Sequence, residues 1–261
     1  MTPVVAVEVA DHIATVTLDR PPVNAVDPTA IAQIRDAFRS LDDRRDVRVA
    51  IFTAAGDRAF MAGADLRAPV ERDRGADVPA TLLIDPARAA RDAMWAITDC
   101  AVPVIGAING PALGAGVAFA ACCDMLVASD NATFGTTEIN VGFLGASAHL
   151  SALVGRHKAR ELYFLGEVVP AAELYRLGAV RAVVPRAELA QVARDLATVL
   201  AAKSPIALRL AKEAMNRVEY LPLKEAYRTE QDYTARLLAF EDSAEARQAY
   251  LDKRPPEWRW R

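Results

Sequence analysis

Residues 103–127 read PVIGAINGPALGAGVAFAACCDMLV, and no charged side chain occurs among them before Asp124. The first part, residues 103–108, is a short apolar run bounded by turn-forming residues, which predicts a buried strand. Residues 113–123 predict a helix built from small residues. The Gly-Ala-Gly sequence at residues 114–116 falls at the junction, where minimal side chains let a ligand approach unpaired backbone N–H groups. Such groups can hold an anion or a developing oxyanion.

Three other interpretations of this stretch compete with a binding site. A membrane span needs about twenty continuous apolar residues, but Pro103 and the Asn109-Gly110-Pro111 turn divide the run into two short pieces. A dinucleotide loop has the order G-x-G-x-x-G, whereas the glycines here follow G-x-x-x-G-x-G and no Walker lysine comes after them. Close helix packing would also explain the small residues, so this stretch alone leaves a purely structural role open.

Length, charge and cysteine content limit the class of protein. A chain of 261 residues can form one large α/β domain, or one domain with a small appendage. The net charge of −3 gives no reason to expect nucleic acid or an anionic membrane as a partner. The three cysteines lie in apolar sequence without disulfide or metal-ligand spacing. Because the first residues also lack a signal-peptide pattern, we expect a cytoplasmic protein.

A second stretch rich in small side chains is AAGDRAFMAGADL, residues 54–66. Gly63 and Ala64 follow the apolar Phe60-Met61 pair, and a loop here would present another N–H to a ligand, although a plain turn also explains the pattern. Residues 67–85 are charged and irregular, which is typical of a mobile cover or of an exposed helix and loop. They would shape the entrance to a site.

The remaining sequence alternates strand and helix patterns and then becomes helical. Strands are predicted at residues 4–9, 12–20, 47–53, 125–128, 132–134 and 182–184, and helices from residue 28 and at residues 86–100, 147–154, 158–165 and 171–177. Residues 187–202, 205–217 and 223–240 carry helical periodicity with few strand signals. We expect this C-terminal portion to pack against other subunits. The final RPPEWRWR is a basic, aromatic tail that would also suit a frayed end.

Six segments together resemble one family. They are LDRPPVNAV (18–26), RAFMAGADL (58–66), residues 103–124, FGTTE (134–138), KAREL (158–162) and AYLDKR (249–254). They are similar, in family order, to the crotonase superfamily, the enoyl-CoA hydratase/isomerase family. The resemblance implies an α/β fold, a crotonase-like spiral of ββα turns, with an acyl-CoA-binding core over residues 1–200. It implies a helical C-terminal oligomerisation region over residues 201–261, and a homotrimer or homohexamer.

The resemblance also implies where an acyl-CoA thioester would bind. Family members hold the thioester oxygen with two backbone N–H groups, which by motif are those of Ala64 and Ala115. An enolate oxygen needs such preorganised donors, and losing one costs about 10²–10³ in rate. Coenzyme A is part of the substrate, and no metal or other cofactor is implied. The further residues that the motifs assign to substrate and CoA binding are Ala62, Asp65, Leu66, Gly114, Tyr250 and Lys253, the last two reaching a neighbouring subunit's site.

One catalytic position departs from the pattern of family hydratases, which usually carry two glutamates. The first position, on the glycine-loop helix, is Ala118 here, and the second is Glu138. A carboxylate in a partly apolar pocket has a raised pKa and can act as base and acid. One glutamate can move a proton between two carbons of an enolate, as family isomerases do. We therefore expect an enoyl-CoA hydratase/isomerase-type enzyme in which Glu138 is the proton shuttle.

Other reactions of the family stay open from the sequence. After Glu138 the segment GFLGASAHL (142–150) lacks the Pro-Gly-x-Gly-Gly pattern common in hydratases. His149 in this segment is a further candidate, although packing and capping are commoner roles for a histidine. The enolate machinery also resembles that of family decarboxylases and thioester hydrolases. A non-catalytic acyl-CoA-binding protein is the alternative of a different class, favoured by Ala118 and opposed by Glu138.

Overall fold

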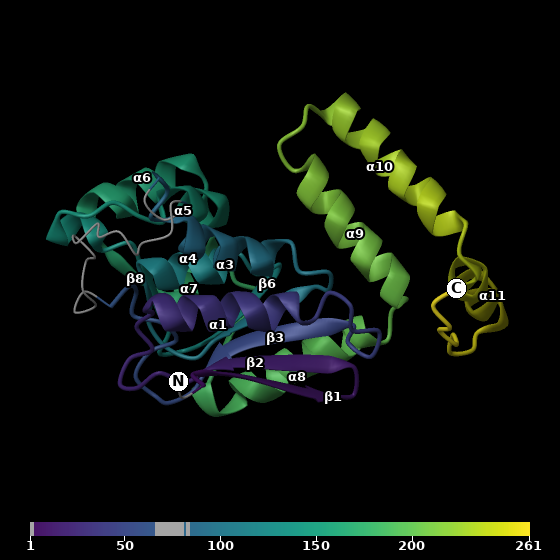
Figure 1. Cartoon of the computed structure of the whole chain (residues 1–261), viewed down its shortest axis with the longest axis horizontal. Helices are drawn as coiled ribbons and strands as arrows, with labels where there is room; N and C mark the ends of the chain where they lie inside the picture. The colour runs from purple at the N-terminus through teal and green to yellow at the C-terminus, as the bar shows by residue number, and fades with distance from the viewer. Residues whose placement is uncertain (1–2, 66–80, 82–83) are drawn as a thin grey trace.

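The structure, a computed structural model, describes residues 3–65, 81 and 84–261 (Figure 1). The predictions for Leu66 and for most of residues 67–85 lie outside this described part. A six-stranded sheet forms the centre of the fold, and β1 and β2 are its antiparallel pair while the remaining neighbours are parallel. In spatial order its strands are β1 (Val5–Ala10), β2 (Ile13–Leu18), β3 (Val49–Ala54), β4 (Val104–Ile108), β6 (Met125–Ser129) and β9 (Ala182–Val184).

A smaller sheet and a set of helices complete the chain. The sheet consists of β5 (Ala112–Leu113), β7 (Thr133–Gly135) and β8 (Val168–Pro170). The helices are α1 (Pro28–Arg39), α3 (Arg88–Thr98), α4 (Ala115–Ala121), α5 (Ser147–Val154), α6 (Arg156–Leu165), α7 (Ala171–Arg176), α8 (Leu189–Ala201), α9 (Pro205–Val218), α10 (Leu223–Leu238) and α11 (Glu241–Asp252), with 3-10 turns η1 (Glu138–Val141) and η2 (Arg186–Glu188). The predicted elements agree with these to within a few residues at their ends.

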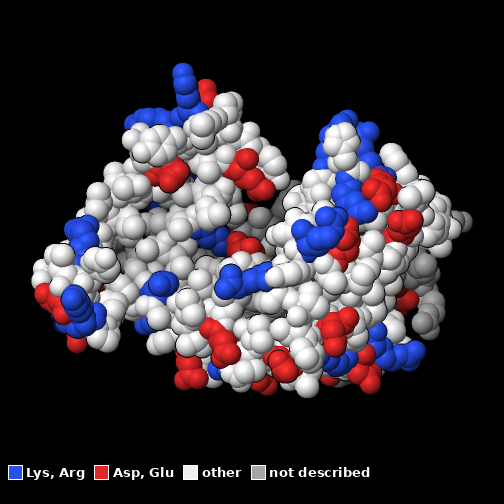
Figure 2. Space-filling model, turned by 180° about the vertical axis from the view of Figure 1, so that it is seen from behind, with Lys and Arg blue, Asp and Glu red and all other residues white. Residues whose placement is uncertain are grey.

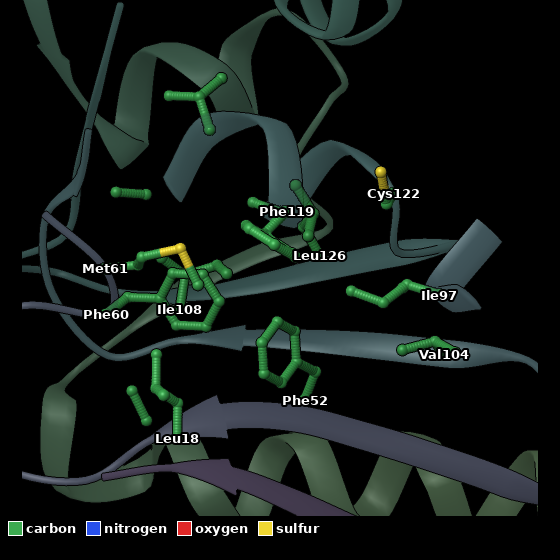
Figure 3. Packing of buried hydrophobic residues seen from close by; sticks show 14 of the residues in the cluster. Leu18, Phe52, Phe60, Met61, Ile97, Val104, Ile108, Phe119, Cys122 and Leu126 are labelled. Atoms are coloured by element: carbon green, nitrogen blue, oxygen red, sulfur yellow. The ribbon is translucent and has the colours of Figure 1, made fainter. Parts of the chain in front are cut away.

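Both faces of the sheet are buried at the central strands β3 and β4, whose successive side chains point to opposite sides, whereas the edge strand β1 is largely exposed. Ile51 of β3 packs in the cluster with α8, whereas the next residue, Phe52, packs in the main cluster with α1 and α3. Phe38 of α1 lies edge-on to Phe52, and Phe52 lies edge-on to Phe60, with ring centroids 5.3 Å apart in each pair. Figure 3 shows Phe52, Phe60 and Met61 within this core. Phe60 therefore anchors the chain immediately before the second small-residue loop.

The helix predicted over residues 113–123 is shorter in the structure and begins at Ala115. Leu113 belongs to β5 instead, since it pairs with Gly135 and its N–H donates to Met61 O at 2.9 Å. The chain turns at Gly114, whose φ of 54° lies in the left-handed region that glycine adopts without a steric penalty. Strand pairing thus overrides helix propensity up to Leu113, and the glycine marks where the helix can start.

The last three helices extend away from the sheet (Figure 1). α9 and α10 pack on each other, and α9 is tied to the body by Lys212, whose Nζ donates to Asp124 Oδ2 at 2.7 Å. The tail is attached to α11, because the buried Asp242 carboxylate accepts hydrogen bonds from the Arg259 and Trp260 N–H groups. These helices and the turn between α9 and α10 expose large apolar side chains, among them Met215, Tyr220, Leu223, Tyr227, Leu238, Tyr250 and Leu251.

The distribution of charge on the surface and the length and polarity of the helices limit the partners that the chain can bind. Acidic and basic side chains are interspersed over the face shown in Figure 2. Such mixing gives no extended field of one sign on that face, in agreement with the small net charge. In the part of the chain that the structure describes, every helix is too short or too polar to traverse a bilayer.

Candidate active site

The two small-residue loops predicted from the sequence lie against each other. Met61 forms a bridge with Ala112, so the chain entering the first loop runs beside the chain entering the second. A Cβ on Gly63 would lie 3.2 Å from Leu113 O and 3.9 Å from Ala115 N, and a Cβ on Gly116 would overlap Met61 O. Glycine is therefore required for this close approach, which brings Ala64 and Ala115 to one place.

Among the described residues, no backbone carbonyl accepts a hydrogen bond from either predicted donor N–H. Ala64 forms a parallel bridge with Val26, in which Val26 N donates to Gly63 O and Asp65 N donates to Val26 O, each at 2.9 Å. In this pattern the N–H of Ala64 itself points away from Val26. Ala115 is the first residue of α4, where an N–H has no partner within the helix. Neither N–H has a hydrogen-bond partner among residues 3–65, 81 and 84–261.

Glu138 begins η1 and places its carboxylate between two glycines. A Cβ on Gly114 would lie 3.0 Å from Glu138 Oε1, and a Cβ on Gly145 would lie 2.8 Å from the same oxygen. Glu138 Oε2 is buried and has no hydrogen-bond partner among the described residues. Burial raises the pKa of Glu138, because the charged form loses hydration. The carboxylate thus lies directly beside the backbone that leads into the Ala115 N–H, in a state suited to accept a proton.

Sequence reasoning missed two residues that hold this arrangement. Gly145 packs against the carboxylate, and its N–H donates to the Tyr163 hydroxyl oxygen at 3.2 Å. Tyr163 is 8% exposed and comes from α6. For Gly145 the only signal in the sequence was that the segment after Glu138, GFLGAS, lacks the glycine pattern common in family hydratases. Tyr163 gave no signal, since a buried tyrosine on an amphipathic helix is usually a core residue.

Position 118 supplies no second carboxylate, and His149 makes no hydrogen bond to Glu138 within the described residues. Ala118 is 1% exposed inside α4, so the structure contains no acidic group at that position. His149 lies half-buried on α5, and burial lowers its pKa by disfavouring the imidazolium. Within the described residues His149 makes no hydrogen bond to Glu138. No set of three or more His, Cys, Asp or Glu side chains in these residues is arranged to hold a metal ion.

The predicted CoA-binding residues are distributed over two regions. Ala62 lies in the first loop and donates its N–H to Val23 O at 3.1 Å, while the Asp65 carboxylate is paired with Arg20 at 3.0 Å. Tyr250 and Lys253 lie at the end of α11, where the tyrosine is 84% exposed. Figure 1 places α11 at the opposite end of the molecule from α4 and α6. Within one chain these two residues are therefore not brought to the Glu138 carboxylate.

Replacing Gly145 with alanine is expected to displace the Glu138 carboxylate, because the added methyl group would lie 2.8 Å from Oε1. Gly145 is outside the left-handed region, so alanine adds this contact without backbone strain. A shift of about 1 Å at a reacting group can cost about 10²-fold, and we expect turnover to fall about 10–100-fold. Steady-state assays of Gly145→Ala measure this. If Gly145→Ala lowered turnover by the same factor in a Glu138→Gln background, its effect would not act through the Glu138 carboxylate.

Comparisons with known proteins come from sequence and from structure. A sequence model of the family described as Enoyl-CoA hydratase/isomerase matches residues 8–261. The chain is 40% identical to a (7aS)-7a-methyl-1,5-dioxo-2,3,5,6,7,7a-hexahydro-1H-indene-carboxyl-CoA hydrolase of Rhodococcus jostii, over 94% of this chain and 93% of that protein. It is 34% identical to a probable enoyl-CoA hydratase of Mycobacterium bovis, over 97% of each chain. The crystal structure of an enoyl-CoA hydratase from Bacillus anthracis is similar, with a TM-score of 0.89 and 30% identity over 98% of this chain and 99% of that chain.

Proposed function

The chain belongs to the enoyl-CoA hydratase/isomerase family, and on this premise we propose that it forms an acyl-CoA enolate and moves a proton with Glu138. The family and the crotonase-like α/β fold predicted from the six motifs are confirmed. The protein is accordingly an enzyme of this family. The oxyanion donors, the single proton shuttle and the acyl group are the parts that we propose.

In the proposed reaction the thioester oxygen accepts hydrogen bonds from the N–H groups of Ala64 and Ala115. These donors stabilise the negative charge that develops when a proton leaves the carbon next to the carbonyl. Glu138 takes that proton, and its raised pKa makes it a stronger base than an exposed glutamate. The same carboxylic acid returns the proton at another carbon of the enolate. The observation that supports this proposal is the Glu138 carboxylate, whose Oε2 has no partner among the described residues and whose Oε1 packs against Gly114, one residue before the Ala115 N–H.

A hydrolase is the second candidate, favoured by the names of two relatives. The proteins of Rhodococcus jostii and Mycobacterium tuberculosis that are 40% and 39% identical to this chain are both named hydrolases of the dioxo indene-carboxyl-CoA compound. Ala118 supports this candidate, because hydration of a double bond in the family uses two carboxylates and this chain has one at those positions. In a hydrolase Glu138 would activate the attacking water, which requires the same base and the same oxyanion donors.

One experiment separates these reactions. The enzyme is incubated in D₂O with a panel of saturated, 3-enoyl, 2-enoyl and cyclic diketo acyl-CoA thioesters, and the products are analysed by mass spectrometry. Deuterium incorporation without addition of water supports proton shuttling. Release of free CoA indicates thioester hydrolysis, and addition of water to a diketo thioester that keeps its CoA indicates ring opening. Binding of the thioesters without any exchange, addition or cleavage would contradict both candidates.

We also propose that the active form is a homotrimer or homohexamer. The number of large apolar side chains exposed on α9, α10 and α11 supports this, because a subunit interface would cover such side chains. Sedimentation velocity at working concentration measures the assembly. A monomer that turns over substrate at the full rate would contradict the proposal.

Lys253 is proposed to approach a CoA phosphate in a neighbouring subunit's site. It ends α11 in a left-handed conformation, exposed beside Tyr250. Lys253→Ala is expected to weaken CoA binding about 3–10-fold at low salt, with a smaller effect at high salt, because exposed ion pairs are screened. Isothermal titration at two ionic strengths measures this, with the exposed Lys203→Ala as the matched control. Equal affinity of the Lys253 and Lys203 variants at low salt would reject the role.

A further inference from the structure

Arg20 joins the loop that carries the Ala64 N–H to the start of α1. Its Nη2 lies 3.0 Å from Asp27 Oδ2 and 3.0 Å from Asp65 Oδ2. Its Nη1 donates to Ala25 O at 2.7 Å. The Arg20 side chain is 25% exposed and the Asp65 side chain is 18% exposed. One guanidinium therefore bridges two partly buried carboxylates from segments 38 residues apart.

Asp65 ends a short ladder in which Ala64 is held. Residues 62–65 lie along residues 23–26, as Ala62 N donates to Val23 O and Val26 N donates to Gly63 O. Asp65 N donates to Val26 O at 2.9 Å, which is the last backbone bond of this ladder on the described side. The Arg20 ion pair adds a side-chain tie one residue after Ala64. It acts at the Asp65 end of the ladder.

At the Asp27 end, the link that Arg20 makes to Asp65 is held by the folded core. Asp27 caps α1, with its Oδ1 accepting from Ala30 N at 2.8 Å. The loop between Arg20 and Asp27 is fixed by Asn24, which is 4% exposed and donates to Ala55 O and Ala59 O at 2.9 Å. Because these anchors belong to the folded core, Arg20 can transmit a fixed position to Asp65 rather than follow its motion.

Position 20 needs a cation that can donate to both the Asp27 and the Asp65 carboxylates. Without the guanidinium, the Asp27 and Asp65 carboxylates would face one gap as like charges and repel each other. The planar fork of arginine can donate to both carboxylates and to a carbonyl at once, which the point charge of lysine does less well. Repulsion would move residues 62–65 away from residues 23–26, and the Ala64 N–H with them.

We propose that Arg20 is a positioning residue for the Ala64 oxyanion donor, acting through Asp65 with Asp27 as its fixed counter-anchor. This inference rests on the proposed enolate function. A donor moved by about 1 Å can cost about 10²-fold in rate. Arg20→Gln is therefore expected to lower kcat about 10–100-fold while KM changes less than about three-fold, since the lost interaction is strongest in the transition state.

The test combines kinetics with a direct probe of the donor. The ¹³C chemical shift of the thioester carbonyl is measured for bound [1-¹³C]butanoyl-CoA, together with kcat, KM and the thermal midpoint. The variants are Arg20→Gln, Arg20→Lys, Asp65→Asn and the double variant Arg20→Gln/Asp65→Asn. Arg44→Gln is the matched control, because it breaks an exposed Arg–Asp pair with Asp46 away from the loops.

Arg20→Gln is expected to lose about half or more of the carbonyl shift seen on binding to the unaltered enzyme. Arg20→Lys and the double variant should recover part of it, the latter because the like-charge repulsion is gone. A full shift and an unchanged kcat in both Arg20→Gln and Asp65→Asn would overturn the inference. Should Arg20→Gln fail to fold, Arg20→Lys and the double variant decide: each is expected to lose part of the carbonyl shift, and a full shift in both would overturn the inference. If the unaltered enzyme itself shows no carbonyl shift, the oxyanion site of the proposed function has failed, which is a distinguishable result.

Discussion

Replacing Glu138 with glutamine is expected to abolish solvent deuterium exchange at the acyl carbon while thioester binding persists. The amide keeps the size of the side chain but cannot accept the proton. General acid and base catalysis contributes about 10²–10⁴-fold, and we expect a loss in that range. The loss should be large if Glu138 is the base, since its Oε2 is buried and makes no hydrogen bond to the described residues. Mass spectrometry of the acyl group in D₂O measures the exchange, and titration with a saturated acyl-CoA measures the binding.

The pH dependence of the unaltered enzyme provides a second measurement of the same assignment. Burial raises the pKa of Glu138 above 4.5, so the base becomes protonated, and kcat/KM falls, at a higher pH than for an exposed glutamate. The pH dependence of folding stability that Glu138 contributes has the opposite sign to that of an ion-paired carboxylate, whose pKa is lowered by folding. The folded state holds the proton longer than the unfolded state, so stability decreases as pH rises from the unfolded pKa through the folded one. The stability advantage of Glu138→Gln should therefore grow as pH rises above the ordinary pKa of a glutamate.

Two results would contradict the role of Glu138. Exchange at the parental rate in folded Glu138→Gln would exclude it as the shuttle and would favour a binding protein or a different base. An acid limb of kcat/KM at the position of an exposed glutamate would show that the buried carboxylate is not the titrating group. Glu167→Gln, an exposed glutamate in the turn after α6, is the matched control.

Removing the N–H of Ala115 is expected to cost about 10²–10³-fold in turnover, because one oxyanion donor is lost. Ala115→Pro is a favourable probe, since Ala115 is the first residue of α4 and proline is tolerated at that position. Ala64→Pro should have a similar effect, and its N–H has no partner in the described residues that the substitution would orphan. Steady-state kinetics, with circular dichroism to check folding, measure the loss.

The control for the oxyanion donors is Ala115→Gly, which keeps the N–H and removes only the methyl group. It should retain turnover within about a factor of ten, as glycine weakens helix α4 by about 1 kcal/mol without deleting a donor. Normal turnover in folded Ala115→Pro and Ala64→Pro would reject the backbone assignment. Equal loss in Ala115→Gly and Ala115→Pro would attribute the effect to helix disturbance instead.

The sequence by itself determined the family, the class of fold and the two loops. Glycine and alanine at residues 62–64 and 114–116 are local requirements of close backbone approach, so they are visible without coordinates. Apolar periodicity likewise predicted most strands and helices, because the spacing of apolar residues along an element reflects which of its faces are buried. Glu138 and the alanine at position 118 could be identified because each lies inside a motif with fixed spacing.

Only the tertiary structure decided how these pieces meet. The Glu138 carboxylate lies between Gly114 and Gly145, and Tyr163 fixes Gly145 across 18 residues. Arg20 reaches Asp65 across 45 residues. The start of α4 also depended on pairing of Leu113 with a distant strand rather than on helix propensity. Contacts between residues far apart in the chain depend on packing of the whole core, and side-chain burial, which raises the pKa of Glu138, exists only once that core has formed.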